Sequence, residues 1–366
     1  MVRLWGINNP TRFAAWSLTI GYWLIRESRG VIALRGKGVP GRRGTASNRV
    51  ALGRGCALSL FLVTLGWLGA PHLVAGEPAA PSPFRFGFST NLFRELNEND
   101  AKAALKVWVE TLAKERGLFA DTNVQLLAGG EVLRHALQGE RVDGAFLTAA
   151  EYWSLGQPAL FDRVVYGVTA GEIAEEYLLL VHRTSPITKL ADLEGRTLGV
   201  LTHSKMSLAR CWLDTTLLHE GLKPSAQFLG QIKEHNKLTK AVLPVFFRQA
   251  DACLITRKGL NTMAELNPQV GKALRILLVS PRLVPDAFFF RTGYPREAKV
   301  RMVAELAKIT STVAGQQVLT VFQTDSLQEF PFSCLDSSLN LLEEHRRLTS
   351  QAGHGQPQFG TSSASQ

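Results

Sequence analysis

Two patterns of apolar residues alternate along the chain from residue 84 onward. Short apolar runs are typical of buried strands, and apolar residues that recur every three or four positions are typical of helices. In residues 100–116, for example, Ala101, Leu105 and Trp108 share one helical face, and Gly117 is suited to end the helix. This alternation predicts an α/β fold. The predicted strands are residues 84–88, 124–127, 142–147, 164–168, 177–181, 197–201, one near 228–232, 252–255, 276–279 and 287–291, and the predicted helices are residues 100–116, 132–138, 207–220, 238–247, 295–314 and 335–349.

The alternating pattern spans about 270 residues, which is more than one hydrophobic core usually covers, so two α/β lobes are predicted. Residues 351–366 are polar and rich in Gly and Ser, and they are predicted to form a disordered tail.

The N-terminal region has a different pattern. Residues 56–70 are uncharged and mostly apolar, two arginines precede them, and Val74 and Gly76 are small enough for the −3 and −1 positions of a cleavage site. Fifteen residues are short for a membrane span, so we interpret residues 56–76 as a signal peptide, with an uncleaved signal anchor as the alternative. Cys56 begins the apolar run, which disfavours lipoprotein cleavage. Residues 1–55 are interpreted as a basic upstream extension that need not be translated. The mature protein is then expected to begin near Glu77 in the periplasm.

The charge distribution changes the meaning of the formal net charge of +10. Residues 1–55 hold ten of the 41 basic side chains and one of the 31 acidic ones, so the rest of the chain is nearly neutral. A neutral body lacks the field that attracts polyanions, and nucleic acid is therefore not an expected partner. Cys211, Cys253 and Cys334 show no metal-ligand spacing and are interpreted as buried thiols; neither a metal nor another cofactor is expected.

Several stretches together resemble a known protein family. They are EVLRHALQGERVDGAFLTAAEY at residues 131–152, ITKLADLEGRTLGV at 187–200, HNKLTKAV at 235–242, QADAC at 249–253 and VPD at 284–286. In this order and spacing they resemble the substrate-binding proteins of phosphate, phosphite and phosphonate ABC importers. The resemblance implies a two-lobed binding fold, with residues 84–183 and 285–350 in the first lobe and 184–284 in the second. It implies a small anionic ligand in the cleft between the lobes, which close about crossings near 183–187 and 283–287.

The resemblance also implies which residues bind the ligand. The loop 202–207 follows a predicted strand and opens a helix, so its N–H groups, its hydroxyls and Lys205 can converge on an oxyanion. Ser204 and Ser207 match hydroxyls that grip the ligand in the family; an ordinary helix cap is the alternative. The full set of candidate ligand-binding residues is Ser89, Thr90, Asn91, Tyr152, His203, Ser204, Lys205, Ser207, His235 and Asp286.

Some candidates have other interpretations. Tyr152 could be a core aromatic, and His235 a surface histidine. Asp286 stands where the family places an acid that receives an amino group of the ligand. His203, Lys205 and Met206 replace small residues of the family, which keeps an anionic ligand plausible but counts against a phosphonate. Arg257 and Lys258 stand beyond Asp251, where the family often has an acidic residue, which leaves the ligand's cationic end unspecified.

Three functions remain open from the sequence. We expect a monomeric periplasmic binding protein that delivers its ligand to an ABC transporter permease. A module that reports the ligand to a membrane sensor is the first alternative. An enzyme on the same fold, with Cys211 as nucleophile and His203 or His235 as base, is the second, although Cys211 falls on the apolar face of its helix.

Overall fold

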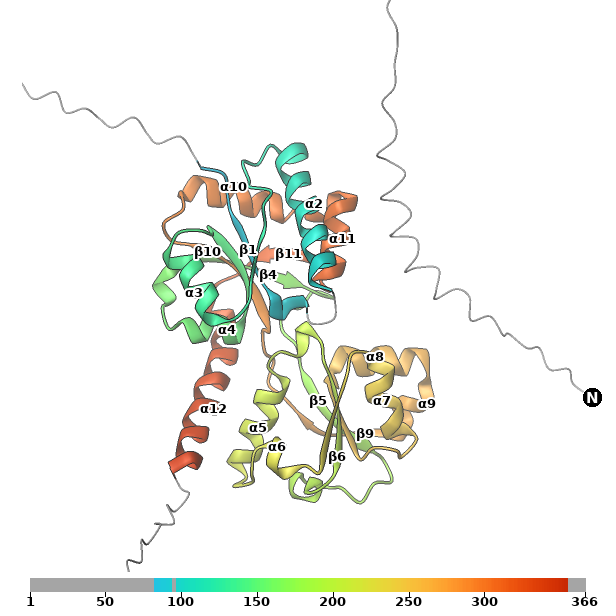
Figure 1. Ribbon diagram of the computed structural model, residues 1–366. Coiled ribbons are helices and arrows are strands. Elements are labelled where there is room, and N and C mark those ends of the chain that lie inside the picture. Colours follow the sequence, from blue (N-terminus) through green and yellow to red (C-terminus); the bar gives the residue numbers. More distant parts are fainter. Residues whose placement is uncertain (1–81, 94–96, 355–366) are drawn as a thin grey trace, which may run out of the picture. The chain divides into compact units, whose positions relative to one another are not determined.

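The computed structural model describes residues 82–93 and 97–354 (Figure 1). The predicted extension 1–55 and signal peptide 56–76 lie outside the described residues, as do residues 355–366 of the predicted tail. Residues 351–354, which were expected in that tail, instead continue the last helix.

The first of two mixed sheets has six strands in the order β11-β4-β10-β3-β1-β2. β1 is parallel to both β2 and β3, whereas β10 is antiparallel to β3 and β4, and β11 is antiparallel to β4. The strands are β1 (Phe86–Ser89), β2 (Gln125–Leu127), β3 (Gly144–Thr148), β4 (Phe161–Val168), β10 (Asp286–Arg291) and β11 (Ser326–Glu329).

The second sheet has five strands in the order β7-β6-β8-β5-β9. β6 is parallel to its neighbours β7 and β8, and β5 is antiparallel to β8 and β9. The strands are β5 (Tyr177–His182), β6 (Thr197–Leu201), β7 (Gln231–His235), β8 (Ala252–Thr256) and β9 (Leu274–Val279).

Helices connect the strands of both sheets (Figure 1). Two short 3-10 turns, η3 (Thr90–Phe93) after β1 and η6 (Ser204–Met206) after β6, are important below. The helices are α2 (Glu98–Arg116), α3 (Gly130–Gln138), α4 (Ala149–Leu155), α5 (Ala209–His219), α6 (Ser225–Phe228), α7 (Leu238–Phe246), α8 (Arg257–Leu266), α9 (Pro268–Ala273), α10 (Arg296–Leu306), α11 (Val313–Val321) and α12 (Asp336–His354).

An aromatic core lies against one face of the first sheet. Phe86 and Phe88, two residues apart on β1, point to the same face and both contact Trp108 of α2. Asn97 caps the N-terminus of α2 by accepting a hydrogen bond from the N–H of Asn99, and Gly117 ends the helix in the left-handed conformation (φ 60°). The helix predicted from the apolar pattern is therefore confirmed, together with its C-terminal stop.

Two segments differ from the predicted elements. The predicted helix 295–314 is interrupted between α10 and α11, where Thr312 caps α11 by accepting from the N–H of Gly315. Hydroxyl side chains favour such caps over helix interiors, which explains the break. The strand expected near 228–232 starts later, because Phe228 ends the short helix α6 and β7 begins at Gln231. The sequence analysis also did not predict the helices α4, α6, α8 and α9 or the strand β11.

The chain crosses between the sheets earlier than expected. The strand β5 was assigned to the first lobe, but it pairs with β8 and β9 in the second sheet, so the crossing near residue 183 is wrong. The chain leaves the first sheet after β4 and returns just before β10. These two connections pair with each other: the N–H of Glu175 donates to the carbonyl of Leu283 (2.8 Å), and the N–H of Leu283 donates back (2.9 Å).

The last helix begins beside this paired connection. The Ser338 hydroxyl, fully buried, accepts from the N–H of Val284 (2.8 Å) and donates to its carbonyl (2.9 Å). Farther along α12, His345 contacts the Thr215 hydroxyl of α5 (3.1 Å). α12 therefore joins the returning connection to a helix of the second sheet.

Candidate ligand-binding site

The predicted site residues other than Tyr152 lie at or near one end of the strands in each sheet. Parallel strands β1 and β3 end at the same edge, at Ser89 and Thr148, and antiparallel β10 begins there, with Asp286 opposite Thr148. In the second sheet, β6 and β7 end together, with Leu201 opposite His235. The turns that follow β1 and β6, η3 and η6, are neighbours in space. Ligands of open α/β sheets bind at the carboxyl ends of the strands, so this geometry favours a ligand site between these two edges.

Glu151, which the sequence reading did not select, organises the first edge. Its Oε1 accepts from the Ser89 hydroxyl (2.5 Å) and from the Asn91 amide (2.8 Å). Its Oε2 accepts from both the N–H (2.9 Å) and the hydroxyl (2.8 Å) of Thr148. Thr148 and Glu151 form a capping box at the start of α4, and the Thr-x-x-Glu spacing is the signal that could have found it. Thr90 lies half-buried in η3, between two donors that Glu151 already engages.

Lys205 joins the second edge to the first. Its Nζ donates to both carboxylate oxygens of Asp286, at 3.0 and 3.2 Å. Lys205 is 8% exposed and Asp286 is 5% exposed, so this ion pair is almost entirely shielded from solvent. Beside it, the Ser207 hydroxyl donates to the Pro285 carbonyl (3.2 Å), and the Tyr177 hydroxyl donates to the Lys205 carbonyl (2.9 Å). Ser204, in the same turn, is buried.

The two predicted histidines lie at the carboxyl ends of neighbouring strands, His203 in the turn after β6 and His235 at the end of β7. His235 accepts, through its carbonyl, the N–H of Thr202 (2.8 Å). The N–H of Lys205 donates to Nδ1 of His203 (3.0 Å), which leaves the ring proton of the neutral imidazole on Nε2. Burial, assisted by the charges of Lys205 and Lys258, lowers the pKa of His203 to about 4. Burial also lowers the pKa of His235. His203 is therefore neutral at pH 7.

Glu175 is a second residue that the sequence reading missed. It lies half-buried in the paired connection. Burial raises the pKa of its carboxyl group, as does the charge of Asp286, while Lys205 and Lys258 act in the opposite direction. Two further ionisable groups, those of Glu175 and Lys258, thus lie near the Lys205–Asp286 pair.

Tyr152 has a different environment. Its ring stacks on Phe289 of β10, with centroids 4.5 Å apart and an interplanar angle of 4°. The rings of Phe161 and Phe332 complete the cluster. The structure therefore places Tyr152 among aromatic residues that pack on the first sheet, which was the alternative interpretation.

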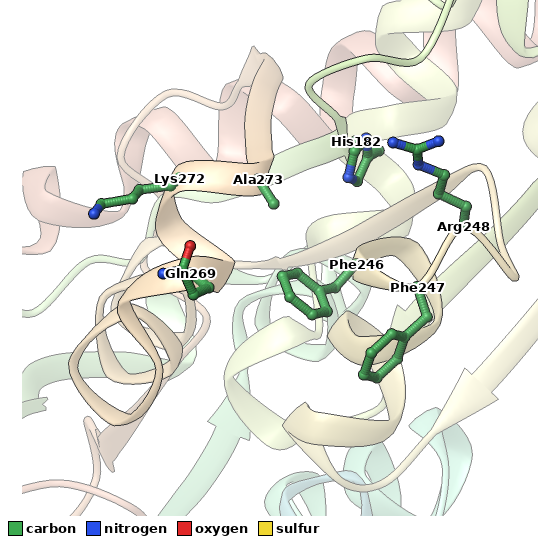
Figure 2. A pocket seen from close by; sticks show the side chains of 7 residues that line it. All are labelled: His182, Phe246, Phe247, Arg248, Gln269, Lys272 and Ala273. Atoms are coloured by element: carbon green, nitrogen blue, oxygen red, sulfur yellow. The ribbon is translucent and has the colours of Figure 1, made fainter. Parts of the chain in front are cut away.

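A cavity of about 460 Å³ lies at the opposite edge of the second sheet (Figure 2). His182, at its rim, ends β5, whereas Tyr177, beside Lys205, begins that strand. Six residues of strand span about 20 Å, so the cavity is remote from the Lys205–Asp286 pair. Figure 2 shows the Lys272 side chain extending away from the other lining residues. The lining residues are His182, Phe246, Phe247, Arg248, Gln269, Lys272 and Ala273.

Neither Cys211 nor Cys253 is an activated nucleophile. Burial raises the pKa of Cys211 to about 11 and that of Cys253 to about 12, so both remain protonated at neutral pH. Within residues 82–93 and 97–354, no cluster of three His, Cys, Asp or Glu side chains is suited to hold a metal ion. Across the same residues, no helix has the length and apolar character of a membrane span.

Comparison with known proteins identifies the family. The sequence profile of the periplasmic substrate-binding proteins of phosphonate ABC transporters matches residues 95–330. The chain belongs to this family. It is therefore a transporter-type binding protein of the periplasm, and family members act with an ABC transporter permease. Among curated proteins, none matches the sequence significantly.

Solved structures confirm the fold of this family member. The phosphonate-transporter binding protein of Pseudomonas aeruginosa is 15% identical, with a TM-score of 0.50 over 76% of this chain and 91% of its own. The chloride-bound form of XAC2383 from Xanthomonas citri is 16% identical, with a TM-score of 0.52 over 73% of this chain and 99% of its own. At such identities the likeness shows the fold alone, and it confirms the predicted two-lobed α/β architecture.

Proposed function

We propose that this chain captures a small oxyanion, phosphonate-like in charge and shape, between the two sheet edges and delivers it to an ABC transporter permease. The observation that carries the proposal is the position of Lys205. Its ammonium group is buried where the edges meet, in a turn that directly follows a parallel strand. A buried cation in a turn that also carries the hydroxyls of Ser204 and Ser207 suits an oxyanion.

The ligand contacts proposed from the second sheet are Lys205, Ser204, Ser207 and the Nε2–H of His203, with His235 beside them. From the first sheet, Thr90 and Asn91 of η3 face the same region, whereas Ser89 supports them through Glu151. Tyr152 would act by positioning β10, on which its ring stacks, because Asp286 begins that strand.

The proposal extends to export and closure. A signal peptide at residues 56–76 would direct the chain to the periplasm, where it acts as a monomer and does no catalysis. The two lobes would rotate about the paired connection at Glu175 and Leu283, because short connections concentrate a rotation in few backbone torsions.

Calorimetric titration of the purified protein with methylphosphonate, phosphate and methanesulfonate tests this function. A bound oxyanion at 100 times its dissociation constant should stabilise the protein by about 2.7 kcal/mol. Ser204→Ala should weaken binding about tenfold or more, because a hydrogen bond to a charged oxygen contributes about 1.5–3 kcal/mol. Ser337→Ala, exposed on α12, is the matched control and should bind like the wild type. If none of the three probes binds, the proposed function is wrong.

A further inference from the structure

The Lys205–Asp286 pair also bears on which oxyanions the site can accept, provided that the proposed function is correct. Asp286 begins β10 of the first sheet, and Lys205 lies in the turn after β6 of the second. Both oxygens of Asp286 accept from the same ammonium group, and both side chains are at least nine-tenths buried. The chain thus supplies its own cation to this carboxylate.

Two other carboxylates around the site are also engaged, and a third lies near cations. Glu151 accepts four hydrogen bonds from neutral donors of its own lobe. Glu176 forms an ion pair with Arg257. Glu175 lies within the influence of both Lys205 and the exposed Lys258 of α8. A ligand ammonium group would therefore meet carboxylates that already hold donors or cations, or, at Glu175, one that lies near two lysines.

We propose that Lys205 occupies the place at Asp286 that a ligand ammonium group would otherwise take, so that this site selects oxyanions without an ammonium group. An ammonium group that displaced Lys205 would leave a buried lysine unpaired, and one that approached without displacing it would meet a like charge at close range. An oxyanion has no such conflict. Two of the three Nζ–H groups serve Asp286, which leaves the third for a ligand oxygen.

Variants of Lys205 and Asp286 should change the ligand preference in different ways. Lys205→Met keeps an apolar stem of similar length and removes the charge, so Asp286 becomes available to a ligand ammonium group. Asp286→Asn leaves Lys205 charged and removes its counter-charge, so oxyanions of either kind should bind more tightly. The double variant has neither charge and should distinguish poorly between the two kinds of ligand.

Isothermal titration calorimetry with ethylphosphonate and 2-aminoethylphosphonate, which differ by one ammonium group, tests the inference. The wild type should bind ethylphosphonate at least tenfold more tightly than 2-aminoethylphosphonate. Lys205→Met should reverse this preference, and the double variant Lys205→Met/Asp286→Asn should reduce it to less than threefold in either direction. Lys258→Met removes a nearby but exposed lysine and should keep the wild-type preference.

The outcomes separate this inference from the proposed function. If the wild type binds 2-aminoethylphosphonate as tightly as ethylphosphonate, or more tightly, the selection is wrong and phosphonate binding stands. If the wild type binds neither probe but binds methylphosphonate, phosphate or methanesulfonate, this inference is wrong and the proposed function stands; if it binds none of the five, both proposals are wrong. If Lys205→Met folds by circular dichroism and keeps the wild-type preference, Lys205 does not exclude the ammonium group. Should that variant fail to fold, Lys205→Gln, which keeps a donor without charge, must at least reduce the preference severalfold; an unchanged preference again overturns the inference.

Discussion

Asp143 and Asp286 are two buried aspartates at opposite edges of the first sheet, and they are held in different ways. Asp143 immediately precedes β3, and Asp286 begins the antiparallel strand β10. Arg85 donates two side-chain hydrogen bonds to Asp143, at 2.7 and 2.8 Å, and Arg291 donates a third, at 3.2 Å. These three residues belong to one sheet. The cation at Asp286 comes from the other sheet.

This difference distinguishes a contact within one sheet, which is expected to hold the fold, from a contact between sheets, which is proposed to take part in ligand binding. The planar guanidinium of Arg85 matches the carboxylate of Asp143 in a two-pronged contact, which ties β1 to β3. Lys205 is a single ammonium on a flexible stem, and its pair with Asp286 can separate without breaking any strand ladder. The first pair is expected to contribute to stability, and the second to binding.

The largest expected effect is on the Asp143 side of this comparison. Asp143→Asn should lower the free energy of unfolding by about 3–5 kcal/mol, because it removes the buried carboxylate that two arginines share and leaves Arg291 with only the exposed Glu140 as a partner. Asp286→Asn should cost less, about 1–3 kcal/mol, because only one cation loses its partner there, whereas two cations do so at Asp143. Urea denaturation measures both values. Glu131→Gln, in an exposed pair on α3, is the control that should leave stability nearly unchanged. If both variants lose the same free energy of unfolding, the proposed difference between the two aspartates is wrong.

A smaller effect is expected from pH at the second edge. The pKa of His203 is lowered to about 4, below its ordinary value of 6.5. Between these two pH values, His203 is protonated in the unfolded chain but neutral in the folded protein. The free energy of unfolding therefore falls as the pH drops from 6.5 to 4. Thermal melts across this range should show a shallower decline for His203→Gln than for the wild type. Identical slopes would mean that His203 is more solvated than the structure indicates.

The smallest expected effect concerns Glu175. Burial raises the pKa of its carboxyl group above the model-compound value of 4.5, so the ionised form destabilises the fold at neutral pH. Glu175→Gln should therefore melt at a higher temperature than the wild type at pH 7, and the difference should close as the pH falls below 4.5. The exposed Glu194→Gln serves as the control. A lower melting temperature at pH 7 would show that attraction to Lys205 outweighs burial.

Most strands and the long helices could be predicted from the sequence, because the apolar periodicity that indicates them is a local property of the chain. The first crossing was misplaced because the apolar run at residues 177–181 fits either sheet, and only its pairing with β8 and β9 decides. Lys205 and Asp286 were both expected to face the ligand, but their pairing was not foreseen. The two residues are 81 positions apart and come from different sheets, so no local pattern can report the contact.

The three described cysteines have a consequence for oxidation chemistry. Cys211, Cys253 and Cys334 are unbridged thiols in a family that works in the periplasm, where disulfides form readily. With pKa values of about 11 and 12, Cys211 and Cys253 are thiolates in roughly one molecule in ten thousand or fewer at pH 7. Thiol–disulfide exchange proceeds through the thiolate, so the folded protein resists cross-linking at these two sites. In the unfolded chain the same thiols regain ordinary acidity, so folding is expected to protect them from exchange.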